Sequence, residues 1–304
     1  MNKKMAVIVS GWYFPMLYYN QLSAQRIPEG WEVDYFCVSH RPPEYAEKEM
    51  KPIVDKLNLE PLTSLDKLLY EEFATVEKLE KIGWNYSLEP NTIGDWAVTN
   101  QWLEKHPNYK DYEILLITHD DNWLLGDDLF YAVLGGRIDT LIRNNISIVG
   151  HEKAAGNESS QVPYDDDWLV ISNGLVNFTA KARGSFDFFK TSLIEDMGGS
   201  FDLSRITETR EGKYDSGEDV YTSTKDWEKT VQNFHNFMYQ NELVDKIRYL
   251  SSAYRVSYWC IEGERGLISN KNTPQQHIYV DALLELAKIG RLGGKYEDGN
   301  TENV

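Results

Sequence analysis

Residues 114–130 read ILLITHDDNWLLGDDLF, an apolar run that ends in two adjacent aspartates. The five residues before His119 are apolar or β-branched, which is typical of a buried strand. Asp120 and Asp121 follow, and Asn122 comes directly after them. In parallel α/β sheets, ligands bind at the carboxyl ends of the strands. The stretch therefore predicts a strand that ends in a polar functional site.

Similar strand-like runs recur along the first half of the chain, with helical patterns between them. Such alternation is typical of an α/β fold, in which a mainly parallel sheet is flanked by helices. The strand-like runs are AVIVS at 6–10, WEVDYFCVS at 31–39, YEILLIT at 112–118 and ISIVG at 146–150, and the helical patterns cover about 43–57, 93–105 and 127–143.

The second half reads differently. Residues 154–167 have the composition of a loop, and a long amphipathic segment runs from 227 to 250. The final residues are polar and contain glycine, so we expect them to fray. We predict one domain over 1–230, with halves 1–122 and 123–230, and a mainly helical C-terminal extension over 231–304 with a disordered tail.

Composition limits the functional classes. The 31 basic and 48 acidic residues give a formal net charge of −17, which argues against a general nucleic-acid binder. Cys37 and Cys260 lie far apart, so neither a disulfide framework nor a cysteine metal site is expected, and we predict a reducing, cytoplasmic location. No apolar run reaches 18 residues, so we expect no transmembrane segment.

The aspartate pair has two interpretations. A divalent cation such as Mn²⁺ or Mg²⁺ takes hard oxygen ligands and would be completed by a substrate diphosphate. Alternatively, the aspartates cap the following helix or lie solvated in a turn. The strand-then-acid pattern alone gives these two interpretations similar weight.

Other stretches change this balance. EPNTIGDWAVTNQW precedes the aspartates, and FDFFKTSLIEDMGGSFD and YDSGEDVYTS follow them. In order and approximate spacing, this set resembles the family 2-like inverting glycosyltransferases of GT-A fold, over about residues 5 to 225. The matching residues are Asn91 and Gly94, Ala97 and Asn100, the 119–122 stretch, Gly198, Gly199, Phe201 and Asp202, and the pair Glu218 and Asp219.

The resemblance implies a nucleoside-diphosphate sugar as donor, a divalent cation, and a carbohydrate or glycoconjugate acceptor. It makes 1–122 the nucleotide-sugar half and 123–230 the acceptor half. His119 stands where the family has the first Asp of its D-x-D motif, so Asp121 becomes the first metal ligand, assisted by His119 or by Asp120 through the ribose or a water. The implied donor-binding residues are Asn91, Gly94, Asn100, Asp120, His40, Arg41 and Trp123.

The Glu-Asp pair carries the implied chemistry. In the family the aspartate is generally the base that deprotonates the acceptor hydroxyl, which makes Asp219 the base and Glu218 its support. The same SGED sequence also fits a helix start capped by Ser216. Both interpretations can hold together, since a helix N terminus is a suitable place for a base.

Further residues are candidates for smaller roles. His235 and His277 are alternatives for a third metal ligand, although each is also an ordinary packed histidine. Trp123 is adjacent to the aspartates and is a candidate for stacking on a sugar. The acidic cluster YDDDW at 164–168 fits a solvated loop better than a metal site.

Two rival functions remain. A nucleotidyltransferase also uses paired carboxylates and a metal, but SGWYFPMLYYNQ after the first strand lacks the Gly-rich basic loop usual there. A non-catalytic carbohydrate-binding or assembly protein of the same fold would explain the histidine in the D-x-D position and Ser200 inserted in the Gly-Gly turn. Donor turnover distinguishes this second rival from an enzyme.

Overall fold

The computed structural model places the main strands and helices of the chain. The residues it describes are 2–48, 72–90, 95–120, 122–124, 126–135, 148–150, 152–153, 180–181, 186–204, 233–234, 237–238, 240–243, 247–249 and 255–257.

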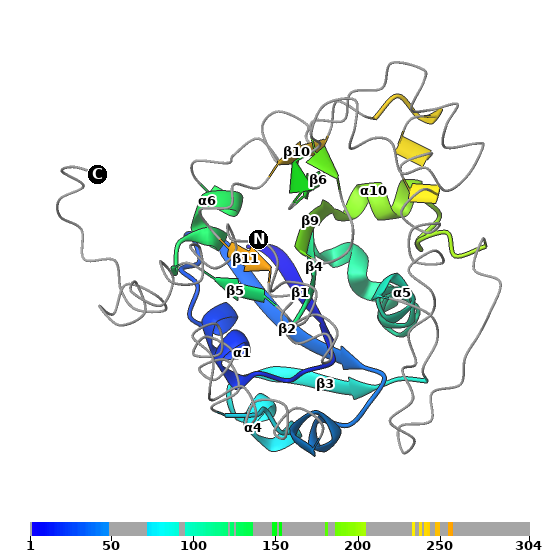
Figure 1. Cartoon of the computed structure of the whole chain (residues 1–304). Coiled ribbons are helices and arrows are strands. Elements are labelled where there is room, and N and C mark those ends of the chain that lie inside the picture. Colours follow the sequence, from blue (N-terminus) through cyan, green and yellow to red (C-terminus); the bar gives the residue numbers. More distant parts are fainter. Residues whose placement is uncertain are drawn as a thin grey trace, which may run out of the picture.

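The main sheet holds seven of the described strands, in the order β10-β6-β9-β4-β1-β2-β3 (Figure 1). All neighbouring pairs are parallel except those of β9, which is antiparallel to β4 and β6. The prediction of an α/β fold with a mainly parallel sheet is confirmed. The bounds are β1 Lys3–Gly11, β2 Trp31–Ser39, β3 Trp84–Leu88, β4 Ile114–His119, β6 Ile148–Gly150, β9 Phe186–Lys190 and β10 Ile247–Tyr249.

Four shorter strands form two small sheets beside the main one. β5 (Asn122–Leu124) pairs antiparallel with β11 (Arg255–Ser257), and β7 (Glu152–Lys153) pairs antiparallel with β8 (Ala180–Lys181). The two aspartates therefore separate β4 of the main sheet from β5 of a small one.

The C-terminal stretch differs from the expected helical extension. Residues 233–234, 237–238 and 240 are helical, as predicted. β10, however, is parallel to β6 at the edge of the main sheet, and β11 pairs with β5. Residues beyond 230 therefore supply strands to two sheets, because an unpaired strand edge is completed by any segment that can bond to its backbone.

Described helices begin in each of the three predicted regions, whereas α1 and α4 were not predicted. Residues 43–48 are helical, at the start of the expected 43–57 helix, and the remainder of that segment lies outside the described residues. Thr75 caps the first turn of α4 by accepting a bond from the Lys78 N–H at 3.2 Å. The helices are α1 Met16–Ser23, α4 Val76–Lys81, α5 Asp95–Lys105, α6 Leu129–Gly135 and α10 Thr191–Asp196, with the 3₁₀ helix η2 at Pro107–Asp111.

Helices cover both faces of the sheet. Met5, Val7 and Val9 of β1 belong to one apolar cluster, together with buried residues of α1, α4 and α6. Ala6 and Ile8 belong to a second cluster, together with buried residues of α5, η2 and α10. Successive side chains of a strand point to opposite faces, so β1 runs through the centre of a three-layer structure (Figure 1).

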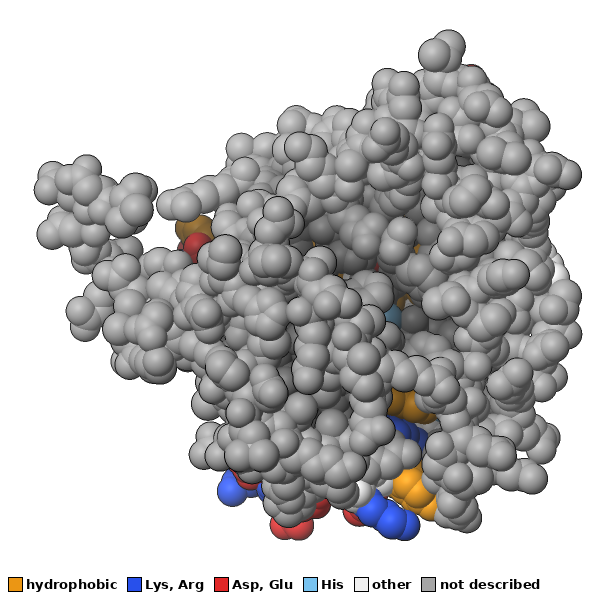
Figure 2. Space-filling model, in the orientation of Figure 1, with side chains coloured by type: hydrophobic (Ala, Val, Ile, Leu, Met, Phe, Trp, Pro, Cys, Tyr) orange, Lys and Arg blue, Asp and Glu red, His pale blue; other side chains and the backbone are white. Residues whose placement is uncertain are grey.

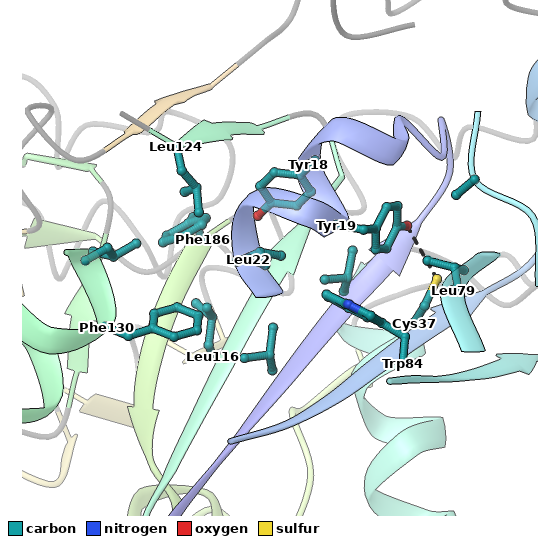
Figure 3. Packing of buried hydrophobic residues seen from close by; sticks show 14 of the residues in the cluster. Tyr18, Tyr19, Leu22, Cys37, Leu79, Trp84, Leu116, Leu124, Phe130 and Phe186 are labelled. Carbon is teal, nitrogen blue, oxygen red and sulfur yellow. Dashed lines mark hydrogen bonds between the residues drawn. The ribbon is translucent and has the colours of Figure 1, made fainter. Parts of the chain in front are cut away.

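Several large aromatic residues lie in the first cluster (Figure 3). The Tyr19 ring of α1 meets the Trp84 ring of β3 edge to face, with centroids 4.9 Å apart. The Tyr19 hydroxyl also reaches Cys37 Sγ of β2 at 3.4 Å. Burying side chains of this size stabilises the fold by about 1.5–3 kcal/mol each, which fixes α1 against the sheet.

The surface shows charges of both signs. In the space-filling view, Lys, Arg, Asp and Glu side chains gather at the lower edge, where α4 lies in Figure 1, and a histidine is visible near the centre (Figure 2). One ion pair there joins Lys78 Nζ to Glu72 Oε1 at 2.7 Å. Of the helices described, none is long and apolar enough to cross a membrane.

Candidate functional site

The carboxyl ends of β1, β2 and β4 meet at one edge of the sheet. β1 lies between β2 and β4, and the register pairs Gly11 with Ser39 on one side and Ser10 with His119 on the other. β2 and β4, the two neighbours of β1, therefore lie on opposite sides of it, so the chain changes side between them. Such a topological switch point is where open α/β sheets bind ligands.

Asp120 lies at the centre of this edge and is only 1% exposed. Its Oδ2 accepts hydrogen bonds from the backbone N–H groups of Trp12 at 2.9 Å, Tyr13 at 3.0 Å and Phe14 at 2.7 Å. Oδ1 also accepts from the Tyr13 N–H at 3.1 Å, and the Tyr19 hydroxyl donates to Oδ2 at 3.2 Å. The carboxylate therefore binds the loop that follows β1.

The loop is shaped for this contact. Phe14 has a φ of 55°, in the left-handed region, and Pro15 follows as the residue that precedes α1. Three consecutive N–H groups converge where such a residue ends a turn, and this arrangement is called a nest. Nests bind anions, and the anion here is the side chain of Asp120.

Burial shifts the pKa of two side chains at this edge, Asp120 and Tyr19. Burial raises the pKa of the Asp120 carboxyl, while the N–H donors of Phe14, Trp12 and Tyr13 and the charge of Arg41 act to lower that pKa. For Tyr19, burial raises the pKa of the hydroxyl well above its usual value, and nearby Cys37 and Asp120 raise it further.

Arg41 holds the same loop from the other side. It is 3% exposed, and its Nε donates to the Trp12 carbonyl at 2.6 Å, with Nη2 bonding the same oxygen. The guanidinium also lies over the Trp12 ring, 4.1 Å from its centroid. The predicted nucleotide-contacting residue is thus engaged with the protein backbone, and its contact with a donor stays a prediction.

His40 and Ser39 complete the end of β2. His40 is buried, and its Nε2 lies 3.1 Å from Gln101 Oε1 of α5. Ser39 Oγ lies 2.6 Å from the Gly11 carbonyl oxygen and 2.7 Å from that of Arg41, and it accepts a bond from the Arg41 N–H. Sequence reasoning missed Ser39 and Tyr19, since neither stands in a motif.

The turn after β4 is closed by Asn122. Its Nδ2 donates to the His119 carbonyl at 2.9 Å and lies 3.3 Å from Thr118 Oγ1. His119 is half-buried at the last position of β4. Trp123 lies on β5 opposite Val256 of β11.

Asn100 joins two of the predicted motifs. Its Nδ2 donates to the Phe201 carbonyl at 2.9 Å, and its Oδ1 accepts from the Phe201 N–H at 2.8 Å. Phe201 follows Gly198 and Gly199, which have φ angles of 88° and 85°. The A-x-x-N motif of α5 therefore holds the Gly-Gly turn after α10 through Asn100, and the predicted contact of Asn100 with a donor stays a prediction.

Several predicted residues lie outside the described part of the chain. Among the described residues, no group of three or more His, Cys, Asp or Glu side chains is arranged to hold a metal ion. The predicted metal ligand Asp121 lies outside the described residues, so its role stays a prediction. The other undescribed candidates are Asn91, Gly94, Glu218, Asp219, His235 and His277, together with the side chain of Trp123.

Several solved structures are similar to the chain at low sequence identity. No family model and no curated protein matches the chain. Mannosyltransferase PcManGT from Pyrobaculum calidifontis, solved with GDP-Man and Mn²⁺, is 14% identical, with 96% of this chain and 72% of that chain covered and a TM-score of 0.45. S. aureus TarS 1-349, solved with UDP-GlcNAc, is 16% identical, with 98% and 68% covered and a TM-score of 0.40.

A third solved structure is the glycosyltransferase GlyE of Streptococcus pneumoniae TIGR4. It is 11% identical, with 83% of this chain and 46% of that chain covered and a TM-score of 0.37. Because the identities and TM-scores are low, an assignment of activity has to rest on the residues of the site.

Proposed function

We propose that the protein is a glycosyltransferase that moves a sugar from a nucleoside-diphosphate sugar to an acceptor hydroxyl, with inversion. The observation that carries the proposal is the position of the 119–122 stretch. His119 ends β4 and Asp120 follows it, beside the carboxyl end of β1, at the switch point where α/β sheets bind ligands. The contact between Asn100 and Phe201, which joins two motifs of the resemblance, supports it.

The diphosphate leaving group needs its charge neutralised. The nest at residues 12–14 is filled by Asp120, so these amides cannot serve a phosphate in this arrangement. His119 and Asp121 offer a ring nitrogen and a carboxylate, and Mn²⁺ accepts both kinds of ligand. These two residues would hold the cation, which supplies positive charge to the leaving diphosphate.

The acceptor hydroxyl needs a base as it attacks. Asp219 takes that proton, and Glu218 orients the acceptor or supports the base. Trp123, adjacent in sequence to the metal-binding stretch, packs against the sugar through its ring. Asn91 and Gly94, which precede α5 in the sequence, contact the donor.

Release of nucleoside diphosphate tests the proposal. The protein is incubated with Mn²⁺ and UDP-GlcNAc, UDP-glucose or GDP-mannose, with and without simple sugar acceptors. We expect release from one donor, and we expect Asp219→Asn to lower kcat about 10²–10⁴-fold with little change in KM. Asp165→Asn, in the rival acidic cluster, is the matched control and retains activity. Absence of release with every donor, together with absence of nucleotide binding, would overturn the proposal.

A further inference from the structure

The loop of residues 12–14 is hydrogen-bonded on two sides by side chains of opposite charge. On one side Asp120, at the end of β4, accepts bonds from all three backbone N–H groups. On the other side Arg41, just after β2, donates from Nε and Nη2 to the Trp12 carbonyl. The Trp12 peptide units are therefore bound through both their N–H and C=O groups.

Both charged side chains are buried and form their hydrogen bonds within the protein. Asp120 and Arg41 are 1% and 3% exposed, so each is removed from water and depends on these bonds. The Tyr19 hydroxyl gives Asp120 a further donor from α1. A carboxylate with this many donors has no need of a ribose hydroxyl or a cation to satisfy it.

The orientation of Trp12 follows from the same contacts. Its ring lies against the Arg41 guanidinium, and its backbone is bonded at both ends. Gly11 allows this close approach, since a Cβ there would lie 2.8 Å from Cys37 Sγ and 2.9 Å from the Phe14 ring. The loop is thus contacted by groups that come from the ends of three strands.

We propose that Asp120 and Arg41 are positioning residues, which clamp the 12–14 loop in its place at the donor-binding edge and do not themselves touch the nucleotide sugar. This inference rests on the proposed function and assigns these two side chains a different role from the one the sequence motif implies. It also means that the amide nest of the loop is an anion receptor whose anion is built into the chain.

An anion receptor that loses its own anion accepts a small one from solution. Asp120→Ala empties the nest, and formate has the size and charge of the missing carboxylate. We expect the variant to raise the donor KM at least tenfold with a smaller change in kcat, and added formate to recover most of that loss. Chloride at equal ionic strength does not recover it. Asp34→Ala is the matched control, since Asp34 also accepts a bond from a tyrosine hydroxyl but lies on the body of β2.

A second variant covers the case in which Asp120→Ala fails to fold. Arg41→Lys keeps the charge but cannot both stack as a plane on Trp12 and donate twice to its carbonyl. We expect it to raise the donor KM with kcat retained, and Arg41→Gln to raise KM further. A folded Asp120→Ala with unchanged KM, or with a loss that formate does not relieve, would overturn the clamp, as would an Arg41→Gln variant with wild-type KM.

Hydrogen exchange separates this inference from the proposed function. The amides of residues 12–14 are expected to exchange faster in Asp120→Ala and to regain protection with formate, whether or not any nucleotide sugar is present. If the wild-type protein binds no donor, the proposed function fails while this readout still decides whether the clamp exists. Unchanged protection of these amides in Asp120→Ala would contradict it.

Discussion

The residue 12–14 loop and the residue 198–201 turn are each held by polar side chains from other elements, but the contacts made by Asp120 and Asn100 differ in kind. Asp120 uses a buried charge against three N–H groups. Asn100 uses a neutral amide, which both donates to and accepts from Phe201. A carboxylate can only accept, so it suits a nest, whereas an amide matches the two edges of a peptide group.

The support around the two contacts differs as well. Phe201 packs on the Trp96 ring with centroids 4.4 Å apart and on Phe189 at 5.5 Å, so apolar contact shares in holding the turn. Tyr13 and Phe14 of the loop are buried in the first apolar cluster too, but the loop makes more hydrogen bonds to other elements, and these bonds go to the charged side chains of Asp120 and Arg41. Loss of the polar side chain is therefore expected to cost more at the loop than at the turn.

Asp120→Ala gives the largest expected change in stability. It removes the acceptor of several buried donors, each of which costs about 1–3 kcal/mol when its bond is lost. We expect the free energy of unfolding in urea to fall by about 3–5 kcal/mol. Asp34→Ala, the control, removes the acceptor of the Tyr112 hydroxyl and is expected to cost about 1 kcal/mol. An equal loss of unfolding free energy in Asp120→Ala and Asp34→Ala would contradict the larger stabilising role assigned to Asp120.

Asn100→Ala tests the turn. The change removes both bonds to Phe201 while the aromatic packing stays, so we expect a loss of about 2 kcal/mol in the free energy of unfolding. Asn100→Asp retains an acceptor for the N–H but places negative charge against the carbonyl, and it should recover little. Glu104→Ala, exposed on the same helix, is expected to change stability by less than about 0.5 kcal/mol. If Asn100→Ala lowered the free energy of unfolding as much as Asp120→Ala, the expected difference between the turn and the loop would be wrong.

Alanine substitutions at the two glycines test the backbone geometry of the turn. Gly198 and Gly199 both have positive φ, which costs a residue with a Cβ about 1 kcal/mol. At Gly199 the new Cβ would also lie 3.2 Å from the Tyr109 hydroxyl, whereas at Gly198 nothing lies within 4 Å. In thermal unfolding, Gly199→Ala is therefore expected to have a lower Tm than Gly198→Ala. Gly83→Ala, with φ of 88° and open space, is the control expected to equal Gly198→Ala.

Alkaline pH gives the smallest expected effect and acts on the loop side. Burial raises the pKa of the Cys37 thiol, which lies beside Tyr19. The unfolded thiol ionises near pH 8.5 while the native thiol stays protonated, so the unfolded state binds fewer protons above that pH and stability falls as pH rises. In a Cys260→Ser background this loss is about 0.8 kcal/mol at pH 9. Urea unfolding at pH 7 and pH 9 measures it, and Cys37→Ala should abolish the difference.

Much of the architecture could be predicted because the relevant signals are local. The apolar runs gave β1, β2, β4 and β6, and the pattern around 93–105 gave α5. The aspartate pair was correctly placed after a strand, since a buried run must end where polar residues begin. β10 and β11 were not predicted, because their three-residue runs are strands only by virtue of the edges they complete.

The contacts of the site residues could not be predicted, because they depend on long-range geometry. Asp120 and Asn100 stand in motif positions, and a motif identifies the residue type without its partner. The N–H groups that Asp120 binds lie more than 100 positions earlier in the chain. The left-handed Phe14 that shapes the nest carries no signal, since glycine or asparagine would be usual there.

Binding of nucleoside diphosphates to the predicted metal-binding stretch tests the central claim most directly. Calorimetric titration of UDP and of GDP, with and without Mn²⁺, would be made on the wild type and on Asp121→Ala. We predict binding of one nucleotide that requires Mn²⁺ and is lost in the variant. Binding that is equal with and without metal, or equal in the two proteins, would contradict the donor site proposed at the end of β4.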